Sequence, residues 1–254
     1  IYPFFLCYKK ITAKSLGIIS IVMIIIMSAS RAVFFGLIVI SIFYFFVIKK
    51  KISSLILVLL SSFVIFFGMI SLNNSENPNL NEIANTVNTA YLYLSGDIEV
   101  DQSLKWRRQL VANGIDALKN TAGIGVGAGG SVAIQEKLGG VDGRFTSMHN
   151  FWIEVLVEGG VIYFILFLFW FLKLTLQLYL LSIKSNNNEI RYFAQSLFLS
   201  MIGFIPSAIT SSSTIYFFPM WIMFGLSLAI IRIAFLENLN KDSDLNEVYA
   251  KVAF

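Results

Sequence analysis

The side chains best suited to chemistry lie in one segment, from Trp106 to Val161. It contains the only histidine of the chain, His149, the adjacent pair Arg107 and Arg108, and a run of glycines. A guanidinium offers a planar set of donors that suits a diphosphate. A neutral imidazole can accept a proton near neutral pH. These residue types therefore suit the binding of a phosphorylated ligand and general-base chemistry.

The two arginines flank a stripe of apolar residues at helical spacing. The stripe predicts an amphipathic helix lying on a membrane or on top of a helix bundle, and it consists of Leu104, Val111, Ile115 and Leu118. Two interpretations are open. Both arginines extend their charged ends past the edges of the stripe, or one of them points into a polar cavity. The sequence does not separate Arg107 from Arg108 in the second case.

The glycine run GIGVGAGG begins at Gly123. Glycine lets a backbone approach a ligand with its amides exposed, so Gly125 and Gly127 are candidate substrate-binding positions. Most glycine runs form turns, which is the competing interpretation. The run lacks the GK[ST] of the phosphate-binding loop of soluble nucleotide-binding proteins. The single cysteine, Cys7, excludes a disulfide framework and a cysteine-ligated metal cluster.

His149 stands where a long apolar helix is predicted to begin, after the possible N-caps Thr146 and Ser147. The partial positive charge of a helix N-terminus disfavours imidazolium and favours an anionic ligand. A lone histidine is more often structural than catalytic, but this placement favours a base. Asn150 follows as a candidate substrate-binding residue.

Three more charged residues complete the candidate set. Glu154 and Glu158 follow Asn150 at helical spacing, and they could bind substrate or pair with the arginines. Arg31 lies between two apolar runs, where a deep charge would cost about 2.5–3.5 kcal/mol and a charge at the surface much less. It could belong to the site or meet lipid phosphates. Trp106, Phe151 and Trp152 could stack on sugars, although an aromatic belt at the membrane surface explains them as well.

Composition identifies an integral membrane protein. Of 254 residues, 57% are hydrophobic and 13% are charged, whereas soluble domains carry about 25% charged residues. The net charge of +4 comes from lysines clustered at segment ends. The positions of these lysines therefore indicate how the chain crosses the membrane, and they do not indicate binding to nucleic acid.

The apolar run from Leu16 to Ile48 is too long for one upright helix, so we predict two, 12–29 and 32–48, turning at Ser30 and Arg31. The predicted fold is all-α, a polytopic membrane bundle of about six helices with one large extracytoplasmic loop between the third and fourth. The first predicted part is residues 1–71 with three helices, of which the third is at 52–71, and the second part is the loop 72–148. The third part is residues 149–232, with helices at 149–182, 192–209 and 214–232. The last part is a mobile cytoplasmic tail at 233–254. Both termini are expected in the cytoplasm.

Three features resemble the O-antigen ligase and O-antigen polymerase superfamily. They are an apolar helix ending in Ser30-Arg31, an outer loop whose arginine helix leads into GIGVGAGG, and a helix opening with HNFWIEVLVEGG. The resemblance covers about residues 20–230. It implies a glycosyltransferase of the bacterial cytoplasmic membrane, without metal or other cofactor, that transfers glycan from undecaprenyl diphosphate on the outer face. By position it makes Arg31, Arg107 and His149 the catalytic residues. The arginines would neutralise the diphosphate, and His149 would position or deprotonate the acceptor hydroxyl.

The resemblance also implies partners. These are the undecaprenyl-diphosphate-linked oligosaccharide donor, a glycan or lipid acceptor, membrane lipids, a flippase and a chain-length regulator, with no nucleic acid. The product would be a capsule, exopolysaccharide or O-antigen type polymer. Family members usually have more membrane helices than this chain offers, so we expect it to be the C-terminal part of a longer bundle or a truncated, inactive copy. Two other functions stay open, a lipid-glycan flippase (transporter) and a non-catalytic membrane assembly partner.

Overall fold

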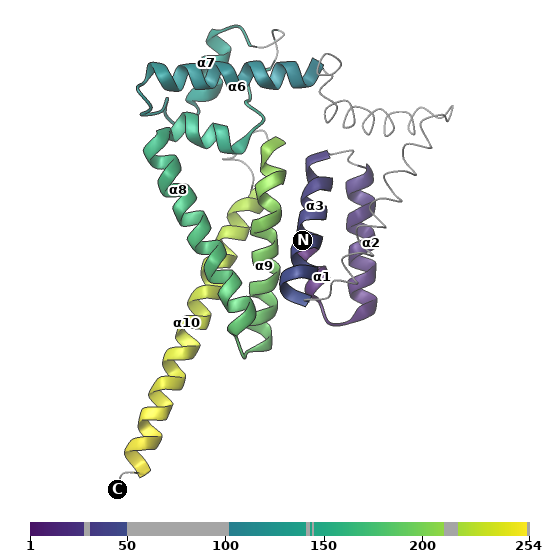
Figure 1. The fold of residues 1–254 in the computed structure, drawn as a ribbon, viewed down its shortest axis with the longest axis vertical. Helices are drawn as coiled ribbons and strands as arrows, with labels where there is room; N and C mark the ends of the chain where they lie inside the picture. Colours follow the sequence, from purple (N-terminus) through teal and green to yellow (C-terminus); the bar gives the residue numbers. More distant parts are fainter. Residues whose placement is uncertain (28–30, 50–101, 141–142, 144, 211–217, 253–254) are drawn as a thin grey trace, which may run out of the picture. The chain divides into compact units, whose positions relative to one another are not determined.

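The computed structural model describes residues 1–27, 31–49, 102–140, 143, 145–210 and 218–252. Within these ranges the regular elements are all helices (Figure 1), in agreement with the predicted all-α class. The predicted third membrane helix and the first part of the predicted loop, up to residue 101, lie outside the described residues. The chain divides into two compact units, and the helices at 11–27, 151–184 and 188–207 each contribute to both.

The first unit comprises residues 1–21, 170–202 and 217–254. Its elements are α1 (Tyr2–Cys7), most of α2 (Ile11–Met27), the second half of α8 (Phe151–Lys184), most of α9 (Asn188–Ser207), and α10 (Phe218–Val252). Aromatic rings pack α8 on α10, with Trp170 and Phe171 each edge-on to Phe224. The phenol of Tyr192 in α9 donates to the carbonyl of Phe4 in α1 at 3.0 Å.

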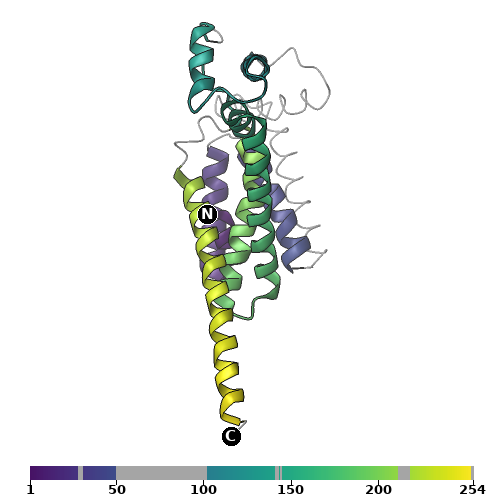
Figure 2. The same ribbon diagram turned by 90° about the vertical axis from the view of Figure 1, so that its left-hand side faces the viewer.

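The last helix is longer than predicted and extends into the predicted tail. We expected the helix to end at Arg232, whereas α10 continues to Val252 and runs past the loop that joins α8 to α9 (Figures 1 and 2). The sequence between Arg232 and Val252 contains no glycine or proline. Nothing in it therefore interrupts the backbone hydrogen bonds of the helix.

Two of the described helices can cross a bilayer by length and composition. They are α8 and the first part of α10, Phe218–Glu237. Large apolar side chains of α8, such as Ile162, Phe169 and Leu172, are exposed. A long helix that is apolar on all sides and largely unburied is suited to contact with lipid.

The second unit comprises residues 22–169 and 203–216. Its described elements are the end of α2, α3 (Arg31–Phe43), a π-helical turn η1 (Tyr44–Lys49), α6 (Gln102–Asn120), α7 (Gly130–Lys137), the first part of α8, and the end of α9 with the 3₁₀ turn η4 (Ala208–Thr210). The run predicted as two helices, 12–29 and 32–48, is α2 followed by α3 and η1. This unit carries the predicted site residues.

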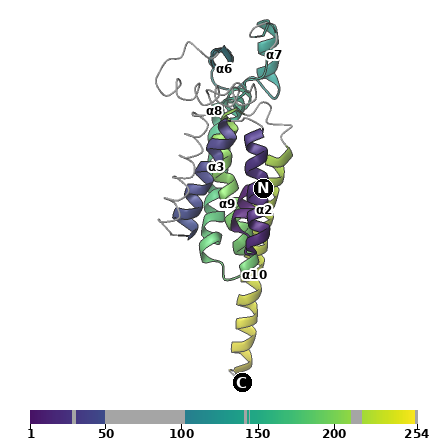
Figure 3. The same cartoon turned by 90° about the vertical axis from the view of Figure 1, so that its right-hand side faces the viewer.

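The predicted amphipathic helix is present as α6, but a different stripe is buried. The buried residues are Leu110, Gly114 and Leu118, whereas Val111 and Ile115 of the predicted stripe are only half-buried. The apolar pattern of the sequence did not predict this face, because Gly114 has no side chain that would add to an apolar stripe. The helix α7 was not predicted, and Figures 2 and 3 show it beside α6 near the start of α8.

The backbone of α8 breaks at Gly160, where φ is +81° and ψ is 174°. In an uninterrupted helix the amide of Val161 would donate to the carbonyl of Val157, four residues earlier. Here it donates to the carbonyl of Gly123 at 2.9 Å instead. The break therefore leaves carbonyls of α8 in need of other donors.

The glycine run supplies those donors. The amides of Val126 and Gly127 donate to the carbonyls of Val157 and Glu158, at 2.9 and 3.0 Å. A Cβ on Gly125 would lie 2.6 Å from the carbonyl oxygen of Glu158, closer than real Cβ atoms come. The absence of a side chain at Gly125 therefore lets the two backbones meet.

Replacement of Gly160 by alanine should destabilise the protein. The new Cβ would collide with the carbonyl of Ile124, and alanine is strained at positive φ, so we expect a loss of about 1–3 kcal/mol. The measurement is the thermal midpoint of the detergent-solubilised full chain. Gly225→Ala is the matched control, because a Cβ there meets nothing within 4 Å. An equal midpoint for both variants would contradict the interpretation of the break.

Candidate functional site

The segment that leads into α8 is fixed to α6 at two points. The ring of Phe145 stacks on that of Trp106, with centroids 4.8 Å apart. Further along, the buried side chain of Met148 fills the space left by Gly114, where a Cβ would collide with the methionine methyl. Residues 145–148 therefore run along α6, and the next residue, His149, emerges beside that helix.

His149 is half-buried and adopts a left-handed backbone conformation, with φ +49°. The helix α8 begins after it, and Asn150 is the N-cap because its side-chain oxygen accepts the amide hydrogen of Ile153 at 3.2 Å. The predicted caps Thr146 and Ser147 are thus wrong, since the helix starts several residues later than they require. Asn150 was predicted to bind substrate; the structure gives it a capping role, and the binding role stays a prediction.

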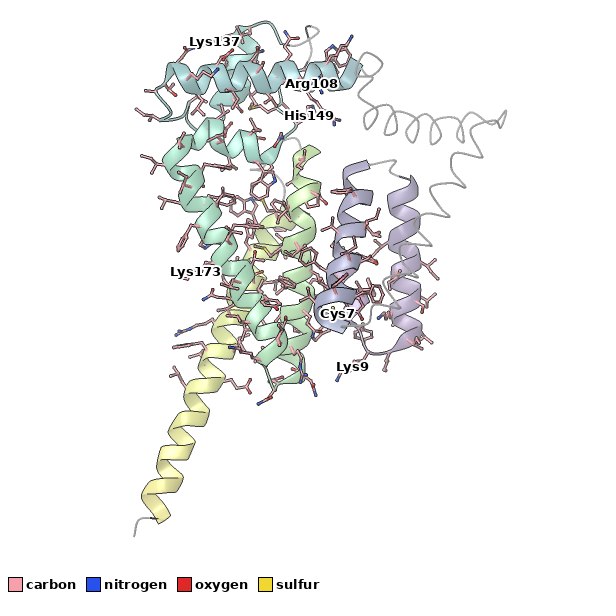
Figure 4. All side chains as sticks on the ribbon, viewed as in Figure 1. Cys7, Lys9, Arg108, Lys137, His149 and Lys173 are labelled. Carbon is pink, nitrogen blue, oxygen red and sulfur yellow. The ribbon has the colours of Figure 1, made fainter. Side chains whose placement is uncertain are left out.

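Arg107 acts on His149 through its charge. Burial lowers the pKa of His149 below the ordinary value of 6.5, and the positive charge of Arg107 lowers it further. Both effects disfavour the imidazolium, so the neutral base predominates at pH 7. Arg107 is half-buried, whereas Arg108 is exposed; Figure 4 labels Arg108 on α6 and His149 in the segment below that helix. The sequence left Arg107 and Arg108 as alternatives, and it is Arg107 that couples to the imidazole.

The two carboxylates of α8 lie in different surroundings. Glu154 is buried, little more than one turn into the helix. Glu158 accepts a hydrogen bond from the hydroxyl of Ser131 in α7 at 2.6 Å. It pairs with that hydroxyl rather than with Arg107 or Arg108, because the exchange of backbone bonds around Gly160 brings this turn of α8 against the loop.

The glycine run is held against α8. As described above, the amide of Gly127 is donated to α8, and the amide of Gly125 points to the hydroxyl oxygen of Thr121 at 3.3 Å. These amides therefore have protein acceptors. The packing role explains both glycines, and their binding of substrate stays a prediction.

Arg31 is the first residue of α3, and its side chain lies outside the described residues. The backbone of α3 packs antiparallel to the end of α9, with Gly36 against Ser207 and Ile40 against Gly203. The start of α8 reaches the same end of α9. There, the indole of Trp152 donates to the carbonyl of Ile205 at 3.1 Å.

The α3 helix, through Gly36 and Ile40, and the first turn of α8 are thus both associated with the C-terminal end of α9. Of the three predicted catalytic residues, Arg107 and His149 interact electrostatically. The distance from the Arg31 side chain to them stays a prediction.

Sequence reasoning missed the polar residues that hold this arrangement. Gln135 in α7 is completely buried; its amide nitrogen donates to the carbonyl of Leu110 at 2.8 Å, and its oxygen accepts from the side chain of Asn113 at 2.8 Å. Only a prediction of α7 itself could have drawn attention to Gln135, and the short GSVAIQEK segment has little apolar periodicity.

Long apolar helices and a polar segment that sets an arginine beside a histidine define a membrane protein with a candidate anion-binding and proton-accepting site. The chain belongs to the O-antigen ligase family, whose model matches residues 16–168. That range contains every predicted site residue. Comparison with curated proteins and with solved structures gave no match.

The electrostatic coupling can be measured directly, because His149 is the only histidine. Replacement of Arg107 by glutamine removes a positive charge that disfavours the imidazolium. We therefore expect the pKa of His149 to rise toward 6.5. NMR titration of the histidine-labelled full chain in nanodiscs is the measurement. Arg108→Gln is the control, and an equal rise in that variant would refute the assignment of Arg107.

Proposed function

We propose that this protein is a membrane glycosyltransferase that polymerises or ligates oligosaccharide carried on undecaprenyl diphosphate, at the outer face of the bacterial cytoplasmic membrane. The observation that carries the proposal is the charge of Arg107 acting on a half-buried, neutral His149 in a chain of the O-antigen ligase family. The product is a capsule, exopolysaccharide or O-antigen type polymer.

His149 acts as the base. The acceptor hydroxyl attacks the anomeric carbon of the donor sugar, and its proton passes to the neutral imidazole. A pKa below the ordinary value makes a histidine a weaker base, but it keeps the imidazole unprotonated at neutral pH. The half-buried position beside α6 leaves part of the ring accessible to an acceptor.

Arg107 and Arg31 stabilise the leaving group. As the bond from the anomeric carbon to the phosphate oxygen breaks, the electron pair stays on the diphosphate, and guanidinium groups bind the growing charge. Arg31 begins α3, and this helix packs through Gly36 and Ile40 on the same end of α9 as the first turn of α8, which supports the inclusion of Arg31. No step in this reaction requires a metal or a nucleotide sugar.

The lipid portion of the donor stays in the bilayer. On the C-terminal side of the break at Gly160, the side chains of Val161, Ile162 and Tyr163 are exposed on α8. This apolar surface begins next to the loop that carries the site. A polyprenyl chain lying along it would present its diphosphate at the membrane surface, where Arg107 and His149 are expected.

Single alanine replacements of Arg31, Arg107 and His149 should abolish most transfer. We expect a fall of about 10²–10⁴-fold for the loss of a general base and about 10²–10³-fold for the loss of a charge-stabilising donor. The assay uses the purified full chain with undecaprenyl-diphosphate-linked oligosaccharide and an acceptor glycan, and follows product mass without ATP or metal.

Lys137→Ala is the control for these variants, because Lys137 is an exposed cation on α7. It should transfer glycan at the wild-type rate. Wild-type transfer by all three site variants would contradict the assignment of these residues. Transport of the lipid-linked glycan across vesicles without formation of a longer product would instead favour a flippase.

A further inference from the structure

The short helix α7 contacts both the helix that carries Arg107 and the helix that begins just after His149. Ser131 and Gln135 are four residues apart, so they lie on one face of this helix. Both are buried, at 2% and 0% exposure, whereas Ala133, Glu136 and Lys137 are exposed. A polar face turned inward is unusual, because a buried amide or hydroxyl is costly unless it is hydrogen-bonded.

The two buried polar groups reach different helices. Gln135 binds α6 twice, through the carbonyl of Leu110 and the side chain of Asn113, both at 2.8 Å. These contacts begin one helical turn after Arg107. Ser131 donates to the carboxylate of Glu158 in α8 at 2.6 Å. One face of α7 therefore joins the helix that carries Arg107 to the helix that follows His149.

We propose that α7 sets the separation between Arg107 and His149, and that Gln135 and Ser131 are its positioning residues. Neither residue needs to touch the substrate. Gln135 fixes how α6 is rotated and how far it stands from α7, and Ser131 fixes α7 to α8. The consequence for glycan transfer rests on the proposed function, whereas the geometric role does not.

The arrangement at Gln135 is stricter than simple packing requires. An amide that donates to a backbone carbonyl and accepts from a side-chain amide has one orientation that satisfies both bonds. An apolar residue of similar size would fill the space without specifying that orientation. The two hydrogen bonds of Gln135 thus fix the orientation of α6, and the contact of Gly114 with Met148 holds the same helix at a further point.

The pKa of His149 reports the separation without any assay of activity. The charged groups of α6 are Lys105, Arg107, Arg108, Asp116 and Lys119, and those of the first part of α8 are Glu154 and Glu158. Of these, Arg107 is the one that lowers the pKa of His149. If α6 shifts when Gln135 is replaced, the effect of Arg107 weakens. The pKa of His149 then rises.

The experiment is a double-mutant cycle on the full chain in nanodiscs, read by NMR titration of the sole histidine. Gln135→Leu should raise the pKa of His149 toward the value in Arg107→Gln, and it should have little further effect when Arg107 is already replaced. Gln109→Leu is the matched control, because Gln109 is the same residue type at an exposed position of α6. Its titration should equal that of the wild type.

Glycan transfer is measured on the same proteins. A displacement of about 1 Å can reduce a rate by about 10²-fold, and we expect a loss of that size in Gln135→Leu and none in Gln109→Leu. Should Gln135→Leu fail to give monodisperse protein, Asn113→Ala and Ser131→Ala can replace it. Asn113→Ala removes a hydrogen bond between α6 and α7, and Ser131→Ala removes the hydrogen bond between α7 and α8. Each should raise the pKa of His149 likewise.

An unchanged pKa of His149 in folded Gln135→Leu would overturn the proposal. A rise of equal size with and without Arg107 would overturn it too, since Gln135 would not then act through the arginine. A rise that depends on Arg107, in a protein whose wild type transfers no glycan, would support the positioning role while refuting the proposed function.

Discussion

The exchange of backbone hydrogen bonds between the glycine run and α8 is the constraint on which the site depends. A helix broken near a membrane surface leaves carbonyls that must find donors, because an unpaired peptide group is costly away from water. At Gly160 the amide of Val161 turns to Gly123, and Val126 and Gly127 return two donors to α8. The loop is thereby joined to the membrane helix through main-chain atoms, which hold their geometry more firmly than long side chains do.

Under the proposed reaction, the effect of Arg107 on the basicity of His149 depends on whether the donor is bound. Without substrate, Arg107 and burial keep His149 neutral. A diphosphate bound beside Arg107 would offset the positive charge, which makes protonation of the imidazole easier. The base would therefore become stronger when the donor is in place, and a single guanidinium would serve both the leaving group and the proton acceptor.

The sequence was informative where the signal is local and periodic. Apolar length predicted α2, α3 and α8 close to their observed bounds, and the residues around His149 led to the correct family. It failed where the structure depends on tertiary contact. The buried face of α6 is centred on Gly114, which matters for the room it leaves to Met148 rather than for hydrophobicity. The glycine run suggested exposed amides, but whether an amide faces a ligand or another backbone depends on what packs against it. Nothing local indicated that the tail would continue α10, or that Gln135 would be buried with both ends of its amide bonded.

The backbone at His149 stands in a conformation that costs a branched or bulky residue energy and that glycine or asparagine adopts readily. A chain selected for durability alone would place one of those two residues at that bend. Glycine would adopt this conformation at less cost than histidine, and backbone strain of this kind often collects at functional sites.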